Sequence, residues 1–147
     1  MPLPAATLDQ LRAIVGADQV LTTKEDLIPY SFDGTAALNQ MPGCVAFVTS
    51  TEQIARVLKL ANATRTPLVT RGSGTGLSGG ALPLANGVLI SLSRMTRILD
   101  VDIPNLRVTV EPGVANLDIT KRVAPYGCYY APDPSSQSVC SIGGNVA

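Results

Sequence analysis

The chain has 147 residues with 11 basic and 11 acidic side chains, so its formal net charge is zero. A neutral chain without runs of like charge argues against nucleic acid or an anionic membrane surface as a partner. Its apolar residues fall in short runs, far below the ~20 needed for a membrane-spanning helix, and no signal peptide is visible. The length suits one domain.

The absence of histidine restricts the chemistry of the chain. It removes the commonest general base and the commonest metal ligand, so we predict no catalytic acid–base group and no metal site here. Cys44, Cys128 and Cys140 are odd in number and lack metal-like spacing. They predict free thiols in a reducing, cytoplasmic setting.

The first half predicts an N-terminal helix followed by a loop. Thr7 and Gln10 resemble a capping box, which predicts a helix that continues to Val15 and ends at Gly16. Residues 31–42 show no periodicity and are expected to form a loop.

A strand, a helix and a second strand are expected next. Residues 44–48 are an apolar run typical of a buried strand, and Ser50 with Gln53 forms a second capping box. The helix that follows should end before Thr66, and residues 67–70 predict another strand. Together these segments predict a compact βαβ unit.

A glycine-rich loop, residues 71–80 (RGSGTGLSGG), leaves that second strand. Glycine loses more entropy on folding than other residues, so such a loop indicates left-handed backbone or close approach to another molecule. Successive N–H groups can form an anion-binding nest, and a phosphate or pyrophosphate is the expected guest. A flexible surface loop is the simpler alternative.

The loop also fits the dinucleotide-binding pattern G-x-G-x-x-G at Gly74, Gly76 and Gly79. That pattern requires a helix directly after the glycines. Pro83 and the turn signal Asn86-Gly87 argue against one, so we interpret the match as accidental. No Gly-Lys-Ser/Thr follows, which excludes a P-loop.

The second half predicts strands over 88–92, 98–101 and 107–110 and a helix over 116–123. The change in composition predicts two subdomains: residues 1–86, a small βαβ lobe with an N-terminal helix, and residues 87–147, the start of a mixed or antiparallel sheet. The expected fold class is α+β.

The tail, residues 131–147, contains two prolines, a serine-rich stretch and the pair Gly143-Gly144. The prolines favour extended backbone, and the glycines allow close approach to a ligand. Because the sequence stops directly after this motif, we expect the chain to be an N-terminal fragment of a longer protein that lacks its substrate domain.

Together these segments resemble the FAD-binding domain of FAD-linked oxidases, of the vanillyl-alcohol-oxidase or PCMH type. They are most similar to the group of the glycolate oxidase flavoprotein subunit and D-lactate and D-2-hydroxyglutarate dehydrogenases. The resemblance rests on residues 67–80, 132–136 and 140–147, with residues 110–114 between them.

The resemblance implies non-covalently bound FAD, since a histidyl linkage is impossible and a packed thiol at Cys140 is favoured over a thioether. It places the pyrophosphate in the glycine loop and the rest of the cofactor along the tail. The Arg71 side chain either contacts phosphate or braces the loop. The implied cofactor-binding residues are Arg71, Gly72, Ser73, Gly74, Thr75, Gly76, Leu77, Ser78, Pro132, Asp133, Ser138, Ser141, Ile142, Gly143, Gly144 and Val146.

The activity that the resemblance implies is oxidation of a small D-2-hydroxy acid, such as glycolate or D-lactate, with hydride passing to the flavin. Substrate-binding residues and electron-transfer subunits would lie outside this chain, which alone is expected to be inactive. The alternatives are the same fold with another alcohol or sugar as substrate, or a non-enzymatic nucleotide-binding fragment.

Overall fold

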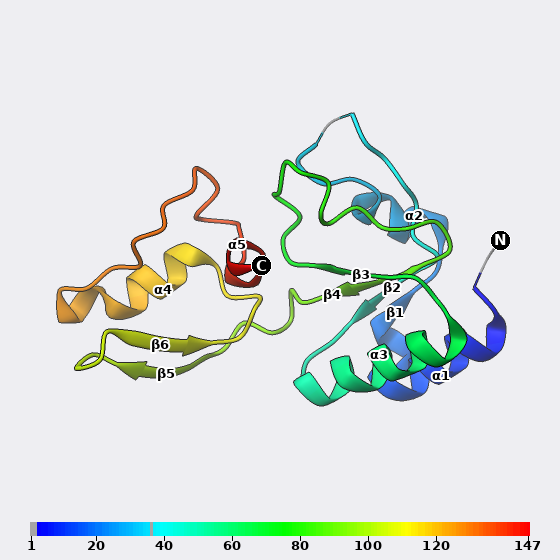
Figure 1. Cartoon of the computed structure of the whole chain (residues 1–147), viewed down its shortest axis with the longest axis horizontal. Helices are drawn as coiled ribbons and strands as arrows, with labels where there is room; N and C mark the ends of the chain where they lie inside the picture. Colours follow the sequence, from blue (N-terminus) through cyan, green and yellow to red (C-terminus); the bar gives the residue numbers. More distant parts are fainter. Residues whose placement is uncertain (1–2, 36) are drawn as a thin grey trace.

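The computed structural model describes residues 3–35 and 37–147, which form two lobes (Figure 1). The first lobe contains α1 (Ala5–Val15), a 3-10 turn (Ala17–Gln19), β1 (Val20–Leu21), α2 (Lys24–Leu27), a second 3-10 turn (Ile28–Tyr30), β2 (Cys44–Phe47), α3 (Thr51–Thr64), β3 (Leu68–Arg71) and β4 (Val88–Ser91). The second lobe contains β5 (Ile98–Asp102), β6 (Arg107–Val110), α4 (Asn116–Val123), a 3-10 turn (Ala124–Tyr126) and α5 (Ile142–Val146). The predicted α+β class is confirmed.

The first lobe is built on a four-stranded mixed sheet with the order β1-β2-β4-β3. β4 is parallel to both β2 and β3, whereas β1 is antiparallel to β2. The predicted strand–helix–strand unit is present, but its two strands are not neighbours because β4 lies between them. The sequence-based prediction that residues 88–92 start the second subdomain's sheet is wrong, since β4 pairs only within the first sheet.

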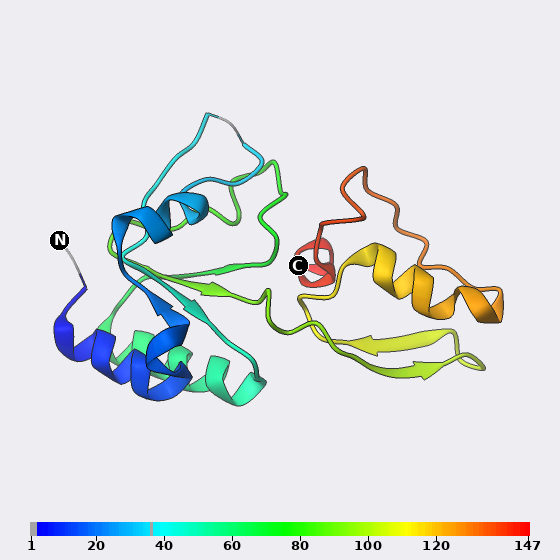
Figure 2. The same cartoon turned by 180° about the vertical axis from the view of Figure 1, so that it is seen from behind.

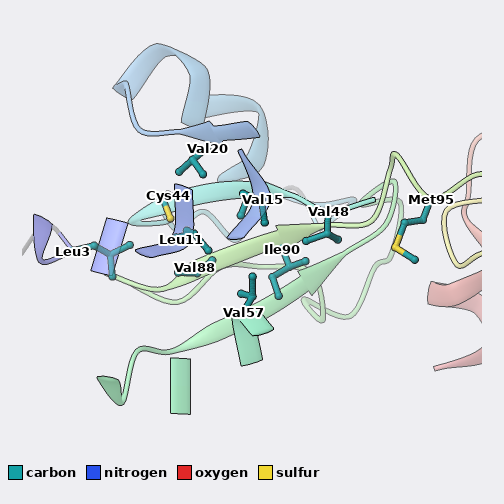
Figure 3. Packing of buried hydrophobic residues seen from close by; sticks show 11 residues of the cluster. Leu3, Leu11, Val15, Val20, Cys44, Val48, Val57, Val88, Ile90 and Met95 are labelled. Atoms are coloured by element: carbon teal, nitrogen blue, oxygen red, sulfur yellow. The ribbon is translucent and has the colours of Figure 1, made fainter. Parts of the chain in front are cut away.

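Both faces of this sheet are covered, which explains the uninterrupted apolar runs of β2 and β4. Cys44 and Ile90 point to the face covered by α1 and α3, where they pack with Leu11 and Val57 (Figure 3). The alternate residues Val45 and Leu89 pack on the other face with Leu27 of α2. The two central strands β2 and β4 therefore form the buried centre of the first lobe.

The helix ends follow local signals in α3 but not at the start of α1. Ser50 caps α3 by accepting a hydrogen bond from the Gln53 N–H at 3.2 Å, as predicted, and Arg65 ends the helix in left-handed backbone. Gly16 ends α1 as expected. The capping box predicted at Thr7 is wrong: the cap position is Pro4, three residues earlier, and the Thr7 side chain is buried.

The predicted loop at 31–42 contains no helix or strand among its described residues; residue 36 lies outside them. In the second lobe the predicted strands at 98–101 and 107–110 are confirmed as β5 and β6, which pair antiparallel. The predicted helix at 116–123 is α4. The sequence predicted no helix in the tail, but Ile142–Val146 forms the short helix α5.

The second lobe has its own small core, formed by Val114, Ile119 and Ile142. Figures 1 and 2 both place α5 on the side of this lobe that faces the first lobe. Within residues 3–35 and 37–147, no helix has the length and apolar character required to cross a bilayer.

We expect Ile90→Ala to lower the free energy of unfolding by about 3 kcal/mol, because it leaves a cavity in the centre of the first lobe. Leu99→Ala is the control: Leu99 is 55% exposed on β5 and should cost less than about 0.5 kcal/mol. Urea unfolding followed by circular dichroism measures both. Equal losses for the two variants would contradict the described core.

Candidate functional site

A cleft of about 520 Å³ lies between the glycine loop and the tail motif. Eight of the residues singled out in the sequence line it: Gly72, Gly74, Thr75, Gly76, Ser78, Ser141, Gly143 and Gly144. The two motifs, about sixty residues apart in the chain, thus meet in one site. The cleft is also lined by residues that were not among the implied cofactor contacts: Thr70, Gly80, Ala81, Leu92, Pro112, Cys140, Asn145 and Ala147.

The glycine loop begins where β3 ends and reaches β4 without forming a helix among the described residues. This confirms that the G-x-G-x-x-G match is accidental, since no helix N-terminus follows it. Gly74 and Gly79 adopt left-handed backbone with φ of 73° and 75°. These two glycines therefore allow the loop to turn through backbone conformations that other residues rarely adopt.

Several backbone donors of the glycine loop are free. Within the part of the chain that the structure describes, the N–H groups of Gly74, Thr75, Gly76 and Ser78 donate no hydrogen bond. All four residues line the cleft, where Thr75 and Ser78 add hydroxyl groups. Such a set of unpaired N–H and O–H donors suits the oxygens of a phosphate or pyrophosphate.

The cleft also has room for a ligand beside these donors. A Cβ atom added at Gly76, Gly80 or Gly144 would meet no protein atom within 4 Å, so the glycines leave open space on both walls. None of the described side chains that line the cleft is charged. The donors that face a ligand here are neutral amides and hydroxyls.

Arg71 points away from this open space. Its guanidinium lies against Gly74 and occupies the position that the Cβ atom of any other residue would take there. Arg71 Nη1 donates to the Phe32 carbonyl oxygen at 2.5 Å, and the guanidinium carbon lies 5.8 Å from the centre of the Tyr30 ring. Arg71 could either contact phosphate or brace the loop, and this geometry favours bracing.

The two motifs contact each other through Ser73 and Ser141. The Ser73 N–H donates to the Ser141 hydroxyl at 3.2 Å, and the Ser73 hydroxyl donates to the Val139 carbonyl at 2.6 Å. Gly72 lies so close to the Ser141 side chain that any Cβ atom would collide with it. This junction holds one end of the cleft closed.

Main-chain hydrogen bonds hold the tail motif against the residues that follow β6. The Gly143 N–H donates to the Pro112 carbonyl at 2.9 Å, and the Ile142 N–H donates to the Val114 carbonyl at 2.8 Å. Ser141 pairs with Ala115 in an isolated β-bridge. The sequence 110–114, noted for its resemblance, is therefore part of the support of the site.

Glu111 anchors this support to the start of the hairpin. Its carboxylate accepts hydrogen bonds from the Arg97 backbone N–H at 2.8 Å and from Arg97 Nη2 at 2.7 Å. These bonds from Arg97 hold the pKa of Glu111 below its ordinary value. Glu111 is buried although it carries a charge, so the pairing with Arg97 offsets the cost of burial.

The other predicted site residues lie outside the cleft lining. Leu77 and Val146 are each 76% exposed, and Ile142 is buried in the core of the second lobe. Pro132, Asp133 and Ser138 are exposed on the segment that leads to the tail motif. Neighbouring residues of one motif thus divide between cleft, solvent and core.

The two lobes and the glycine-lined cleft between them are the architecture of a PCMH-type FAD-binding domain. The chain belongs to the FAD-binding domain family, whose model, described as "FAD binding domain", matches residues 42–147. This confirms the family, the fold class and the FAD cofactor predicted from the sequence.

Similar proteins have been named for 2-hydroxy-acid oxidation. The chain is 49% identical over 142 residues to the glycolate oxidase subunit GlcD of Escherichia coli (strain K12), covering 97% of the chain and 28% of that protein. It is 38% identical to the glycolate oxidase subunit GlcD of Bacillus subtilis (strain 168), covering 94% of the chain and 29% of that protein. The chain therefore spans under a third of the length of these curated relatives.

The fold is also found at low sequence identity. An alkyldihydroxyacetonephosphate synthase structure superposes with a TM-score of 0.86 at 22% identity, over 97% of this chain and 29% of that protein. This similarity concerns the fold alone.

We expect Gly72→Ala to open the junction between the two motifs, because the added methyl group collides with the Ser141 side chain. The measurement is hydrogen exchange of the flavin-free chain, where the amides of residues 73 and 139–142 should exchange faster. Gly76→Ala adds its methyl group in open space and should leave these amides protected. Unchanged protection in Gly72→Ala would show that the junction is not packed as described.

We expect Glu111→Gln to lower the thermal midpoint at neutral pH, because it removes the negative partner of Arg97. A carboxyl whose pKa is lowered by folding stabilises the fold above its ordinary pKa of 4.5, and this stabilisation is lost as the pH falls. The difference between wild type and variant should therefore shrink in acid. The control is Glu25→Gln, an exposed position, whose thermal midpoint should remain close to wild type at neutral and at acidic pH. If the difference in thermal midpoint between wild type and Glu111→Gln did not change with pH, the pairing with Arg97 would be contradicted.

Proposed function

We propose that this chain is the N-terminal, FAD-binding part of an FAD-linked oxidoreductase that oxidises a small D-2-hydroxy acid such as glycolate or D-lactate. The observation that carries the proposal is the cleft, in which free N–H groups of the glycine loop face the tail motif across open space. The names of the similar proteins support the substrate class.

The FAD pyrophosphate is proposed to bind the free N–H groups of the glycine loop and the Thr75 and Ser78 hydroxyls. Ser141, Gly143 and Gly144 would line the opposite side of the cofactor. Since the cleft lining carries no charge, binding depends on oriented dipoles and close backbone approach. Of the remaining predicted contacts, Arg71 and Ser73 would act by shaping the loop, and Leu77, Pro132, Asp133, Ser138 and Val146 would contact the cofactor only at its edges.

FAD, when bound, supplies a hydride acceptor for the carbon that bears the substrate hydroxyl. The chain's own residues would bind and orient the cofactor and leave one side of the cleft open. Among the described residues that line the cleft, Cys140 alone has an ionisable side chain, and it is buried. The base for the hydroxyl proton and the cations for the substrate carboxylate are therefore proposed to come from residues beyond this chain.

The setting is proposed to be cytoplasmic, supported by three free cysteines. Non-covalent binding of FAD is supported by the lack of histidine and by the burial of Cys140. Electrons would leave for a separate acceptor, such as an electron-transfer subunit.

The test is the visible absorption of the purified chain after mixing with FAD and removal of free flavin. We expect a flavin band to elute with the wild-type chain, and Gly76→Leu to lose it, because a Cβ atom at this position meets open space and the larger side chain would occupy the cleft. The thermal midpoint of the flavin-free Gly76→Leu variant should stay at the wild-type value. Thr22→Leu, exposed and away from the cleft, is the control that should keep the flavin.

Two further results decide between the possibilities. In the full-length protein, anaerobic addition of glycolate or D-lactate should bleach the flavin band; bleaching by another alcohol or sugar instead would overturn the substrate class. Absence of flavin in both the chain and the full-length protein would overturn the proposed function.

A further inference from the structure

A second loop packs against the glycine loop. Residues 31–35 and 37–43, light blue to cyan in Figure 1, run beside the green glycine loop, and Figure 2 shows the same arrangement from behind. The Gly34 N–H donates to the Gly76 carbonyl at 3.0 Å. A Cβ atom on Gly34 would lie 2.8 Å from that oxygen, so the two backbones are in direct contact.

Arg71 is the centre of this contact region. The residue is 8% exposed, although it carries a guanidinium group. Burial lowers the pKa of Arg71, and the negative charge of Asp33 raises it. A buried cation is costly unless an opposite charge compensates it, and Asp33 is the acidic group that acts on Arg71 from the supporting loop.

Asp33 is itself buried, with 7% exposure. Its Oδ1 accepts the Thr35 N–H at 2.8 Å, while Oδ2 has no hydrogen-bond partner within the described part of the chain. An ionised carboxylate in this position also requires compensation. Among the described residues Asp33 and Arg71 form no direct ion pair, so Asp33 acts on Arg71 through space, beside the Phe32 carbonyl that accepts a hydrogen bond from the guanidinium.

We propose that Asp33 is a positioning residue of the FAD site: its buried charge holds the Arg71 guanidinium against Gly74, and this fixes the arc of the glycine loop that presents the free N–H groups. Asp33 does not line the cleft and would contact no ligand. It acts only through Arg71 and the loop. The role in cofactor binding rests on the proposed function, whereas the role in ordering the loop does not.

The sequence offered no signal for this pairing. Asp33 stands in a segment without periodicity, 38 positions before Arg71. Only the contacts of Phe32 and Gly34 with the glycine loop bring Asp33 into the neighbourhood of Arg71. The site therefore depends on a loop that contributes none of its lining.

The experiment compares wild type, Asp33→Asn, Arg71→Met and the double variant by hydrogen exchange of the flavin-free chain and by FAD titration. We expect Asp33→Asn to speed exchange of the amides of residues 72–76 and to weaken FAD binding about tenfold, as supporting residues of ligand sites commonly do. Asp100→Asn removes an exposed aspartate on β5 and is the matched control, with neither effect expected.

The double variant tests whether the two residues act as a pair. Because it buries no uncompensated charge, its losses should be smaller than the sum of the two single losses. Additive losses, or unchanged exchange at residues 72–76 in Asp33→Asn, would overturn the inference. Arg71→Lys keeps the charge, so if Asp33→Asn fails to fold, faster exchange in Arg71→Met than in Arg71→Lys supports the inference and equal exchange overturns it.

The two proposals fail in different ways. If wild type binds no FAD, the proposed function loses its support while the exchange data still decide whether Asp33 orders the loop. If wild type binds FAD and Asp33→Asn binds it equally well, the proposed function stands and the positioning role is overturned.

Discussion

The connection between β3 and β4 is the constraint on which the rest of the structure depends. These strands are adjacent and parallel, so the chain must return from the end of one to the start of the other. In most such connections a helix makes the return, but here residues 72–87 do so without one. The backbone of this segment is therefore left exposed, with N–H groups that no helix uses.

This constraint links the two lobes. The first part of the connection lies beside the carboxyl ends of the parallel strands, where ligands of such sheets commonly bind. The second lobe reaches the same place through Ser141 and the backbone of α5. The cleft is thus formed by local backbone on one side and by long-range contacts on the other, and the supporting loop with Asp33 stabilises only the first.

Local signals predicted the elements whose stability is local. The apolar run at 44–48 and the cap at Ser50 were sufficient for β2 and α3, because both act through neighbouring residues. The place of β4 between β2 and β3 was not predictable, since its apolar run suits any buried strand. α5 was missed because two of its five residues are glycines, which disfavour helix, and its N–H bonds to Pro112 and Val114 come from distant sequence.

The site was predicted as two motifs but not as individual contacts. Gly143 lines the cleft while its neighbour Ile142 packs into the second lobe's core, and Val146 is exposed. Such alternation depends on the direction of α5, which the sequence did not reveal. For Arg71 the sequence left phosphate contact and bracing of the loop equally open, and only its burial against Phe32 and Gly74 favours the internal role.

The neutral lining of the cleft has a consequence for how firmly a cofactor is retained under changing conditions. Attraction between exposed charges weakens as salt is added, whereas short hydrogen bonds from oriented amides depend little on ionic strength. Amide donors also keep their protons across the physiological pH range. A pyrophosphate held by this loop would therefore stay bound through shifts in salt and acidity that loosen sites built from lysine or histidine.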